Sequence, residues 1–416
     1  MQARWAARAG IEATFEVMTD HTTKPRDDDA LAMIRDMYHV SGGQTLNASY
    51  SILHHVDGRD FGGPMDEHSK LNINRADDRA LLLALDDMSL DLLYAVGDWL
   101  DQDNEISTLG VERDYYRSLE TPYEPRNGPM QSLGEIELVA GIWPKYFRGE
   151  DWNLNGRLDS NENDGSRSFP PDQSDSILDP EWSGHLTVYS VAGGATASGQ
   201  PRIYLRNATP EDLTRRLEID EAQALALIEF GKNSGNSLSD LLFTALGGGE
   251  NTPPPNSGDQ QPNPRSQQQQ RQQPQQNQQQ AGPGAFTDAQ LRAVFAETSI
   301  EDPLDRLPGK INLNTVSSKF LRDIIAFLGL DETIADEILY MRDSRPQGIL
   351  SIADLQKIPN IQPDELRAVT RRFDTVSSVY TISSRGRSAA SGLEVEIIAV
   401  VDRSTVPVRI IEYREQ

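Results

Sequence analysis

The chain has 416 residues and a formal net charge of −25. This length exceeds what one hydrophobic core usually supports and predicts roughly two to four compact units. The acidic surplus repels phosphate backbones, so it disfavours nucleic-acid binding and favours divalent cations or basic partners. Because the chain has no cysteine, disulfides, thiolate zinc sites and cysteine nucleophiles are excluded. It also has no apolar run of about 18 residues, the length that a membrane-spanning helix needs, and no signal peptide.

The first residues already show a helical pattern. Ala6, Ala7, Ile11 and Phe15 recur at helical spacing, with no capping residue ahead of them. We therefore expect a helix entered midway, with a segment upstream of it missing from this sequence. The next predicted element is a strand over residues 48–53.

A short motif recurs along the chain. Residues 70–74 (KLNIN) return as 310–314 (KINLN), and a weaker copy lies at 202–207. Each copy precedes short segments with helical apolar spacing, so we expect three small helical modules. The predicted helices cover 80–85, 90–100 and 133–139 in the first module, 222–230 and 238–245 in the second, and 320–328, 334–341, 352–358 and 363–373 in the third.

The region between the second and third modules is of low complexity. Residues 249–284 are rich in proline and glutamine and nearly free of apolar side chains, which predicts a flexible linker. Strands return later, over 379–382, 393–401 and 406–413, and should form an antiparallel meander. With the first helix and the early strand, they predict an α+β fold into which the helical modules are inserted.

Several segments, taken in order, carry a family resemblance. They are 8–12 (RAGIE), 70–74 (KLNIN), 97–101 (GDWLD), 114–116 (DYY) with 122–123 (PY), 132–142 (SLGEIELVAGI), 400–403 (VVDR) and 407–410 (PVRI). In this order they resemble general secretion pathway protein K, a minor pseudopilin of type II secretion. The resemblance covers most of the chain outside the glutamine-rich linker.

The resemblance implies a pilin-like N-terminal helix and small antiparallel sheet, interrupted by small all-helical modules of helix-hairpin-helix or SAM-like type. Residues 1–69 would hold the N-terminal helix and first strand, and residues 375–416 the C-terminal strands that complete the pilin-like domain. Between them would lie a first helical module (70–150), a calcium-loop region (151–182), a second module (183–248), the Pro/Gln-rich linker (249–284) and a third module (285–374). The third module and the linker look like additions to the family pattern.

The resemblance also implies a function. Such proteins are non-enzymatic structural subunits at the tip of a pseudopilus, where they support protein export across the outer membrane. We therefore expect other minor pseudopilins and the pseudopilus as partners, and no nucleic acid. The family is first anchored in the inner membrane by an apolar N-terminal helix, expected here upstream of the given sequence. The protein would then be periplasmic.

One segment fits a metal site by its spacing alone. Residues 151–162 match the calcium loop of EF-hand type, in which oxygen ligands recur at alternating positions and a glycine makes the sharp turn. The chain offers this glycine as Gly156. The predicted ligands of Ca²⁺ are Asp151, Asn153, Asn155, Arg157 (through its backbone carbonyl), Asp159 and Glu162.

Alternatives to this site remain open. The loop is otherwise a solvated Asp/Asn-rich turn that binds nothing. Its flanks cannot continue a helix, because 163–165 (NDG) and 170–171 (PP) break one, so it is a single loop rather than an EF-hand pair. Asp172, Asp175 and Asp179 follow closely and are candidates for a second ion. The acidic clusters 86–87 and 101–103 are expected to be solvated helix ends.

Two rival functions come from other classes. The third module resembles the helix-hairpin-helix of DNA receptors, whose hairpin backbone approaches phosphates. Here Asp331 and Glu332 occupy that approach, which favours a packing role. A secreted calcium-dependent adhesion module is the other alternative. Enzyme chemistry has no support, because the sequence shows no nucleophile elbow or phosphate loop.

Overall fold

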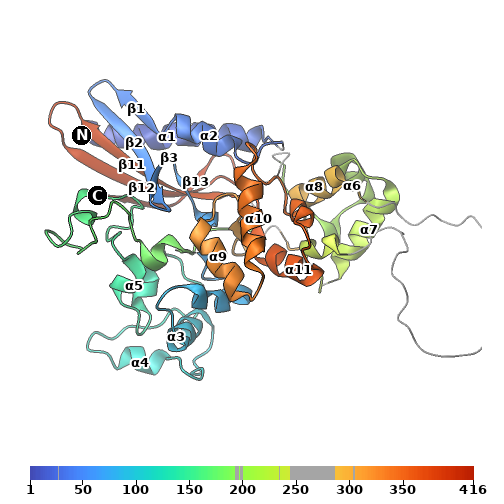
Figure 1. Ribbon diagram of the computed structural model, residues 1–416, viewed down its shortest axis with the longest axis horizontal. Coiled ribbons are helices and arrows are strands. Elements are labelled where there is room, and N and C mark those ends of the chain that lie inside the picture. The colour runs from blue at the N-terminus through green and yellow to red at the C-terminus, as the bar shows by residue number, and fades with distance from the viewer. Residues whose placement is uncertain (27, 193–195, 197–199, 234, 244–285, 303–304) are drawn as a thin grey trace, which may run out of the picture.

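The computed structural model describes residues 1–26, 28–192, 196, 200–233, 235–243, 286–302 and 305–416 (Figure 1). The linker predicted over 249–284 lies outside these residues. The described part consists of an antiparallel sheet covered by the N-terminal helix, with groups of shorter helices at one end and one side of it (Figure 1). The predicted α+β class is confirmed.

The main sheet takes its strands from both ends of the chain. Its order is β1-β2-β11-β12-β13, and all neighbours are antiparallel. Residues 48–52 of β2 pair with residues 384–388 of β11, which joins the two ends at the centre of the sheet. The strands are β1 (Gly42–Thr45), β2 (Ala48–Val56), β11 (Val379–Ser388), β12 (Glu394–Asp402) and β13 (Arg409–Glu415), with β3 (Arg59–Gly62) on β2 and β4 (Met65–Asp66) on β11.

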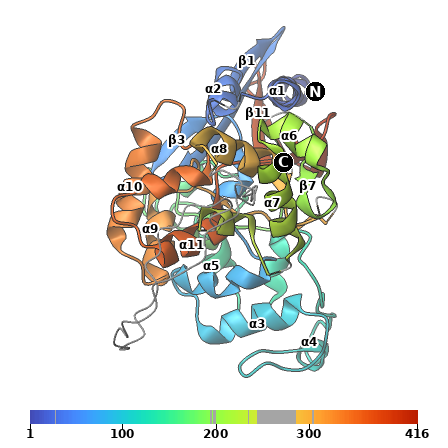
Figure 2. The ribbon, with the colours of Figure 1, turned by 90° about the vertical axis from the view of Figure 1, so that its right-hand side faces the viewer.

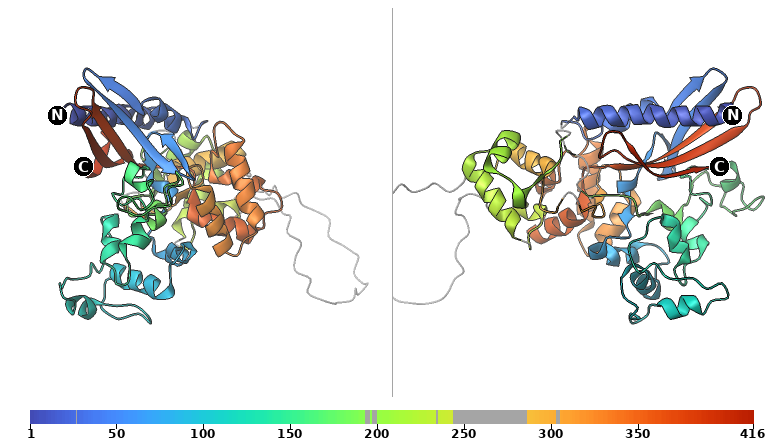
Figure 3. Two further views of the ribbon diagram at one scale, coloured as in Figure 1. Left: turned by 60° about the vertical axis from the view of Figure 1, so that its left-hand side comes forward. Right: turned by 180° about the vertical axis from the view of Figure 1, so that it is seen from behind.

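Helix α1 (Gln2–Thr23) lies along one face of this sheet (Figure 3). Small residues let its backbone approach the strands closely. The Ser384 hydroxyl donates to the Ala7 carbonyl at 2.8 Å. A Cβ on Gly386 would lie 1.9 Å from the Ala3 carbonyl oxygen, so only glycine fits there. None of the helices in the described part of the chain combines the length and the apolarity needed to cross a membrane.

The helices away from the sheet are short. Figure 2 shows α3 and α4 apart from α9, α10 and α11, with α6 and α7 on another side. Their bounds are α2 (Ala32–His39), α3 (Leu90–Leu100), α4 (Arg113–Arg117), α5 (Pro144–Arg148), α6 (Pro210–Leu217), α7 (Glu221–Lys232), α8 (Asp288–Glu297), α9 (Ser318–Phe327), α10 (Glu332–Asp343) and α11 (Pro363–Arg372). The prediction of helices over 90–100, 222–230, 320–328, 334–341 and 363–373 is confirmed.

Four other predicted helices are 3-10 turns rather than α-helices. All four have the tighter i→i+3 hydrogen bonding of a 3-10 helix, and two of them, η3 and η7, begin at a capping box. They are η2 (Ala76–Ala84), η3 (Leu133–Leu138), η7 (Leu238–Leu242) and η8 (Ile352–Lys357). Further 3-10 turns are η1 (Glu67–Ser69), η4 (Ser160–Glu162), η5 (Glu181–Gly184) and η6 (Leu205–Asn207).

The repeated motif has the same local structure in each copy. Every copy forms a two-residue strand in a parallel pair: β5 (Leu71–Asn72) with β6 (Leu186–Thr187), β7 (Ile203–Tyr204) with β8 (Thr298–Ser299), and β9 (Ile311–Asn312) with β10 (Phe373–Asp374). The first and third copies also share a side-chain clamp. Asn74 exchanges two hydrogen bonds with the backbone of Met130, and Asn314 exchanges two with the backbone of Ile349.

Among the described residues, three apolar cores hold these parts together. One lies under α1 and includes Ile52 and Ile397. A second lies among α6, α7 and α8. The largest is shared by the helices that follow the first and third copies of the motif, so that Trp99 and Phe320 belong to one core. These two helical groups therefore stabilise one another.

Candidate metal centre

The 151–162 loop follows α5 and is fixed to the sheet by backbone contacts. The amide of His55 on β2 donates to the Gly156 carbonyl at 2.7 Å. Gly156 has φ of +67°, a conformation that glycine adopts without strain, as the calcium-loop pattern predicts for this position. Glu162 closes the loop in η4.

The first three predicted ligands turn their side-chain oxygens into the loop. Asp151 accepts the amides of Asn155 and Gly156, both at 2.9 Å. Asn153 accepts the Asn155 amide at 3.0 Å, and Asn155 accepts the Arg157 amide at 2.8 Å. These bonds fold the backbone around the alternating oxygens, which is the arrangement that a loop of this type needs before it binds an ion.

Asp159 is held by a denser set of donors. Its Oδ2 accepts the side-chain amides of Asn153 and Asn155, each at 2.9 Å. Its Oδ1 accepts Nη2 of Arg385, on β11, at 2.6 Å. Arg385 also lies 3.3 Å from Glu396 Oε2 on β12. A guanidinium therefore already neutralises part of the loop's negative charge, and a bound cation would compete with it.

Glu162 is the least satisfied of the predicted ligands. One carboxylate oxygen, Oε2, accepts the Asp159 amide at 3.0 Å. The other, Oε1, has no hydrogen-bond partner although the residue is only 1% exposed. An unpaired buried carboxylate oxygen is costly, and a cation beside it would remove that cost.

The electrostatics of the loop follow from this burial. Burial raises the pKa of Asp151 to about 6 against the pull of two backbone amides. Burial also raises the pKa of Glu162 to about 8, and the charges of Asp151 and Asp159 add to that rise. The pKa of Asp159 is lowered, because the hydrogen bond and charge of Arg385 outweigh its burial. The loop thus holds two carboxylates whose charge is poorly compensated.

Some residues of the loop fit a calcium ion well, whereas at Asp159 the guanidinium of Arg385 already occupies the carboxylate. Asp151, Asn155 and Glu162 are buried and present hard oxygens. Arg157 is also buried, but its side chain reaches Ser51 and Glu396 rather than the loop. The candidates for a second ion are not gathered. Asp175 and Asp179 each accept an amide of their own local turn, whereas Asp172 accepts the amides of Asp164, Gly165 and Ser174.

Sequence reasoning missed Arg385 and Glu396, which touch the loop from the sheet. Arg385 is 226 residues from Asp159 in the chain. A signal for Glu396 was present, because it interrupts the apolar run of β12 and is buried next to Ile397. A buried charge in a strand requires a partner, which is the role that Asn155 and Arg385 fill.

Comparison with known proteins bears on the segment that precedes this loop. Residues 69–149 match the family model described as "Type II secretion system (T2SS), protein K". We call this matched segment the protein K domain, after the family that it is similar to. The match confirms the resemblance inferred from the sequence. The protein K domain holds α3, α4, η3 and α5, and it ends two residues before the 151–162 loop.

One sequence relative and one solved structure are similar to this chain. Type II secretion system protein K of Pectobacterium carotovorum subsp. carotovorum is 41% identical over 54 residues, which cover 13% of this chain and 16% of that relative. The alignment thus spans less than a fifth of the relative's length. A solved structure, titled "The Crystal Structure of the GspK-GspI-GspJ complex from enterotoxigenic Escherichia coli Type 2 Secretion System", covers 100% of this chain and 96% of that chain at 9% identity and a TM-score of 0.47.

Proposed function

We propose that this protein is a non-enzymatic minor pseudopilin of type II secretion, placed at the tip of the pseudopilus. The observation that carries the proposal is the protein K domain at residues 69–149. The fold is compatible with it. Helix α1 covers an antiparallel sheet built from both ends of the chain, which is the arrangement expected of a pilin-like domain with helices inserted in it.

The proposed mechanism is steric. The shorter helices gather toward the C-terminal end of α1 and beside the sheet, away from the N-terminus (Figures 1 and 3). If α1 packs into a filament through its N-terminal part, this bulk lies where the next subunit would be added. The protein would then begin or end the fibre. Helix α1 exposes Trp5, and the edge strand β13 exposes Ile410 and Tyr413, apolar groups that partner subunits would cover.

We place the protein in the periplasm, with other minor pseudopilins as its partners and with initial anchoring in the inner membrane. The proposed helical insertions are of helix-hairpin-helix or SAM-like type and serve packing rather than DNA binding. Their polar faces carry acidic groups such as Asp331 and Glu332, both exposed at the start of α10. Gel shifts at low salt would reveal DNA binding if this assignment were wrong.

We also propose that the 151–162 loop binds one Ca²⁺ as a structural brace. Asp151, Asn153, Asn155, Asp159 and Glu162 would supply side-chain oxygens, and Arg157 its carbonyl. The buried, unpaired Glu162 Oε1 supports this, because it is an acceptor without a donor. A bound ion would tie the end of the protein K domain to β2, β11 and β12 through the contacts of the loop.

The function is tested by co-purification. The chain should copurify with the other minor pseudopilins encoded beside it, and its deletion should block secretion. Trp5→Ala should weaken the complex, whereas Tyr340→Ala, which alters an equally exposed aromatic residue on α10, should not. Failure of the wild-type chain to associate with these proteins would refute the proposal. Intact secretion after deletion would favour the adhesion alternative.

A further inference from the structure

A cavity of about 550 Å³ lies where the helical groups that follow the three copies of the repeated motif meet. Its lining comes from η2 of the first group, from η7 of the second, and from β10 and the end of α11 of the third. Among the described residues that line it, none belongs to the 151–162 loop. The cavity is therefore a feature separate from the candidate metal centre.

The charge of this cavity is opposite in sign to that of the chain. The whole chain carries 64 acidic residues against 39 lysines and arginines. Four acidic and five cationic side chains line the cavity. The cationic ones are Arg75, Arg202, Lys310, Arg371 and Arg372. A positive surplus at one place in so acidic a protein attracts an anionic ligand.

The acidic side chains leave part of this positive charge uncompensated. Asp78 is shared by two guanidiniums, because Arg75 Nε lies 2.6 Å from its Oδ2 and Arg372 Nε lies 3.3 Å from its Oδ1. Arg371 is exposed, and none of the described residues pairs with its side chain. Its guanidinium is therefore available to a ligand.

Lys310 is a half-buried cation with a single acceptor. Its Nζ donates to the Thr370 carbonyl, near the C-terminus of α11, at 2.9 Å. An ammonium has three N–H groups, and no carboxylate of the described residues forms an ion pair with this one. Burial lowers the pKa of Lys310, and the nearby charge of Asp374 opposes that shift. An anion beside Lys310 would favour its charged form.

The first copy of the motif shows what the third copy lacks. Lys70 begins the first copy, as Lys310 begins the third. Lys70 Nζ lies 3.8 Å from Oε1 of Glu67, three residues earlier, and both side chains are buried. Three residues before Lys310 the chain has Leu307, which carries no charge. The first copy thus neutralises its lysine internally, whereas the third leaves its lysine to a group from outside.

We propose that this cavity binds an oxyanion of phosphate or carboxylate type, with two or more negative charges, through Lys310 and Arg371. A guanidinium matches the paired oxygens of either group, and an ammonium adds a point charge. The contact of Lys310 with α11 accounts for one of its N–H groups but not for the unpaired Arg371. The volume is in the range of small-molecule sites, so the cavity has room for a molecule that carries the anion. The inference does not rest on the proposed function or on calcium binding by the 151–162 loop.

The test is isothermal titration of the full chain with sodium phosphate and, separately, with sodium citrate, both at constant ionic strength. The protein is first stripped of metal and then dialysed free of chelator, because the chelator is itself a polycarboxylate. Wild type should bind one anion per chain, and the probe that binds more tightly assigns the phosphate or the carboxylate class. Lys310→Met and Arg371→Gln should each weaken binding roughly tenfold or more, since each removes a charged hydrogen-bond donor. Arg59→Gln, an exposed arginine on β3 outside the cavity, should bind as wild type does.

A further variant tests the comparison between the copies. Leu307→Glu places a carboxylate where the first copy has Glu67 and removes no cation, so it should also weaken binding roughly tenfold. Circular dichroism shows whether each variant is folded, and Arg371→Gln and Leu307→Glu keep the test open if Lys310→Met, which loses its contact with α11, is not. The proposal is wrong if wild type binds neither probe, or if Arg371→Gln and Leu307→Glu both bind as tightly as wild type.

Discussion

Arg385, in the middle of strand β11, donates to Asp159 of the 151–162 loop at 2.6 Å and also lies 3.3 Å from Glu396. One guanidinium therefore connects the loop to two adjacent strands. It also occupies the place where a cation would neutralise the same carboxylates. The contact is both a brace and a competitor for an ion.

Removing this guanidinium should separate the two roles. Arg385→Met keeps most of the apolar stem but leaves Asp159 and Glu396 buried without it. In chelator, we expect a loss of about 2–4 kcal/mol in the free energy of unfolding, because one partner of a buried pair is removed. In calcium, part of that loss should return, and calcium affinity should rise because the competitor is gone.

Urea unfolding in chelator and in calcium measures both effects. Arg387→Met, two positions along the same strand and exposed, is the matched control and should change stability little. If Arg385→Met lowers calcium affinity instead, the guanidinium supports the ion site rather than competing with it.

Glu162 provides the most direct test of the loop. Glu162→Gln keeps the shape of the side chain and its acceptor for the Asp159 amide. It removes a carboxyl group whose ionised form burial disfavours, so that its pKa is raised to about 8. In chelator the variant should therefore be as stable as wild type or more so. Calcium should raise the melting temperature of wild type and should raise that of the variant much less, since the ion loses the negative charge and one of the two oxygens of the carboxylate.

Differential scanning calorimetry with calcium and with chelator gives both melting temperatures. Glu211→Gln, an exposed acid on α6, is the control. If calcium raises the melting temperatures of Glu162→Gln and Glu211→Gln equally, the 151–162 loop does not bind calcium.

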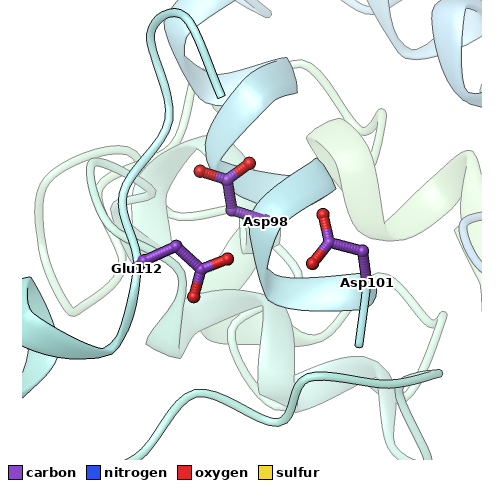
Figure 4. A group of neighbouring side chains, drawn as sticks. All are labelled: Asp98, Asp101 and Glu112. Carbon is purple, nitrogen blue, oxygen red and sulfur yellow. The ribbon is translucent and has the colours of Figure 1, made fainter. Parts of the chain in front are cut away.

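Features formed by residues that are close together in the sequence could be predicted, whereas contacts between distant residues could not. The helix at 90–100 is written in local spacing and is confirmed. The calcium loop at 151–162 is also a pattern of local spacing, and its binding of an ion stays a prediction. The carboxylates of Asp98, Asp101 and Glu112 lie close together in the structure (Figure 4). The sequence did not predict this, because Asp98 and Glu112 meet only when residues 101–112 fold back. Arg385 was missed for the same reason over 226 residues. Short apolar segments such as 133–139 predicted helices correctly but not their 3-10 form, because the apolar spacing of so few residues does not distinguish the two.

The asparagine clamps make a prediction about the repeats. Asn74 and Asn314 each exchange two hydrogen bonds with a distant backbone segment, at 2.8 and 2.9 Å in both cases. Asn74→Ala and Asn314→Ala should each cost about 1–3 kcal/mol, because a half-buried amide and carbonyl lose their partners. Asn47→Ala, at an exposed turn, should cost much less.

Denaturant unfolding of the three variants measures these costs. Because the groups after the first and third copies share one core, both clamp variants should lower the same cooperative transition rather than uncover a separate one. An early transition that appears in Asn314→Ala alone would show that the third group unfolds independently.

Because His185 is largely buried, we expect part of the folding stability to be lost at acidic pH. It stacks on Phe320 with ring centroids 4.6 Å apart. Burial lowers its pKa from 6.5 to about 4, with Lys319 and Lys70 adding to the shift and Asp323 and Asp179 opposing it. The unfolded chain takes up the proton below about pH 6.5 and the folded chain only near pH 4, so stability is lost as the pH falls through this window.

When the pH is lowered from 7 to 5, protonation of His185 in the unfolded chain should reduce the free energy of unfolding of wild type by about 2 kcal/mol. His185→Phe should not show this loss. His39→Phe, at an exposed position, should show the same pH dependence of stability as wild type.

Glu181 lies nearby in the sequence, and its ionisation changes stability in the opposite direction with pH. Burial first, then Asp179, Asp87 and Asp86, raise its pKa to about 7. Its ionisation therefore costs stability as the pH rises from about 4.5 through 7. Glu181→Gln should be more stable than wild type at pH 8 and equally stable at pH 4.5. Unfolding curves of His185→Phe and Glu181→Gln, measured across this pH range, should therefore depart from wild type at opposite ends of it. Parallel curves would mean that neither group is as buried in solution as its packing requires.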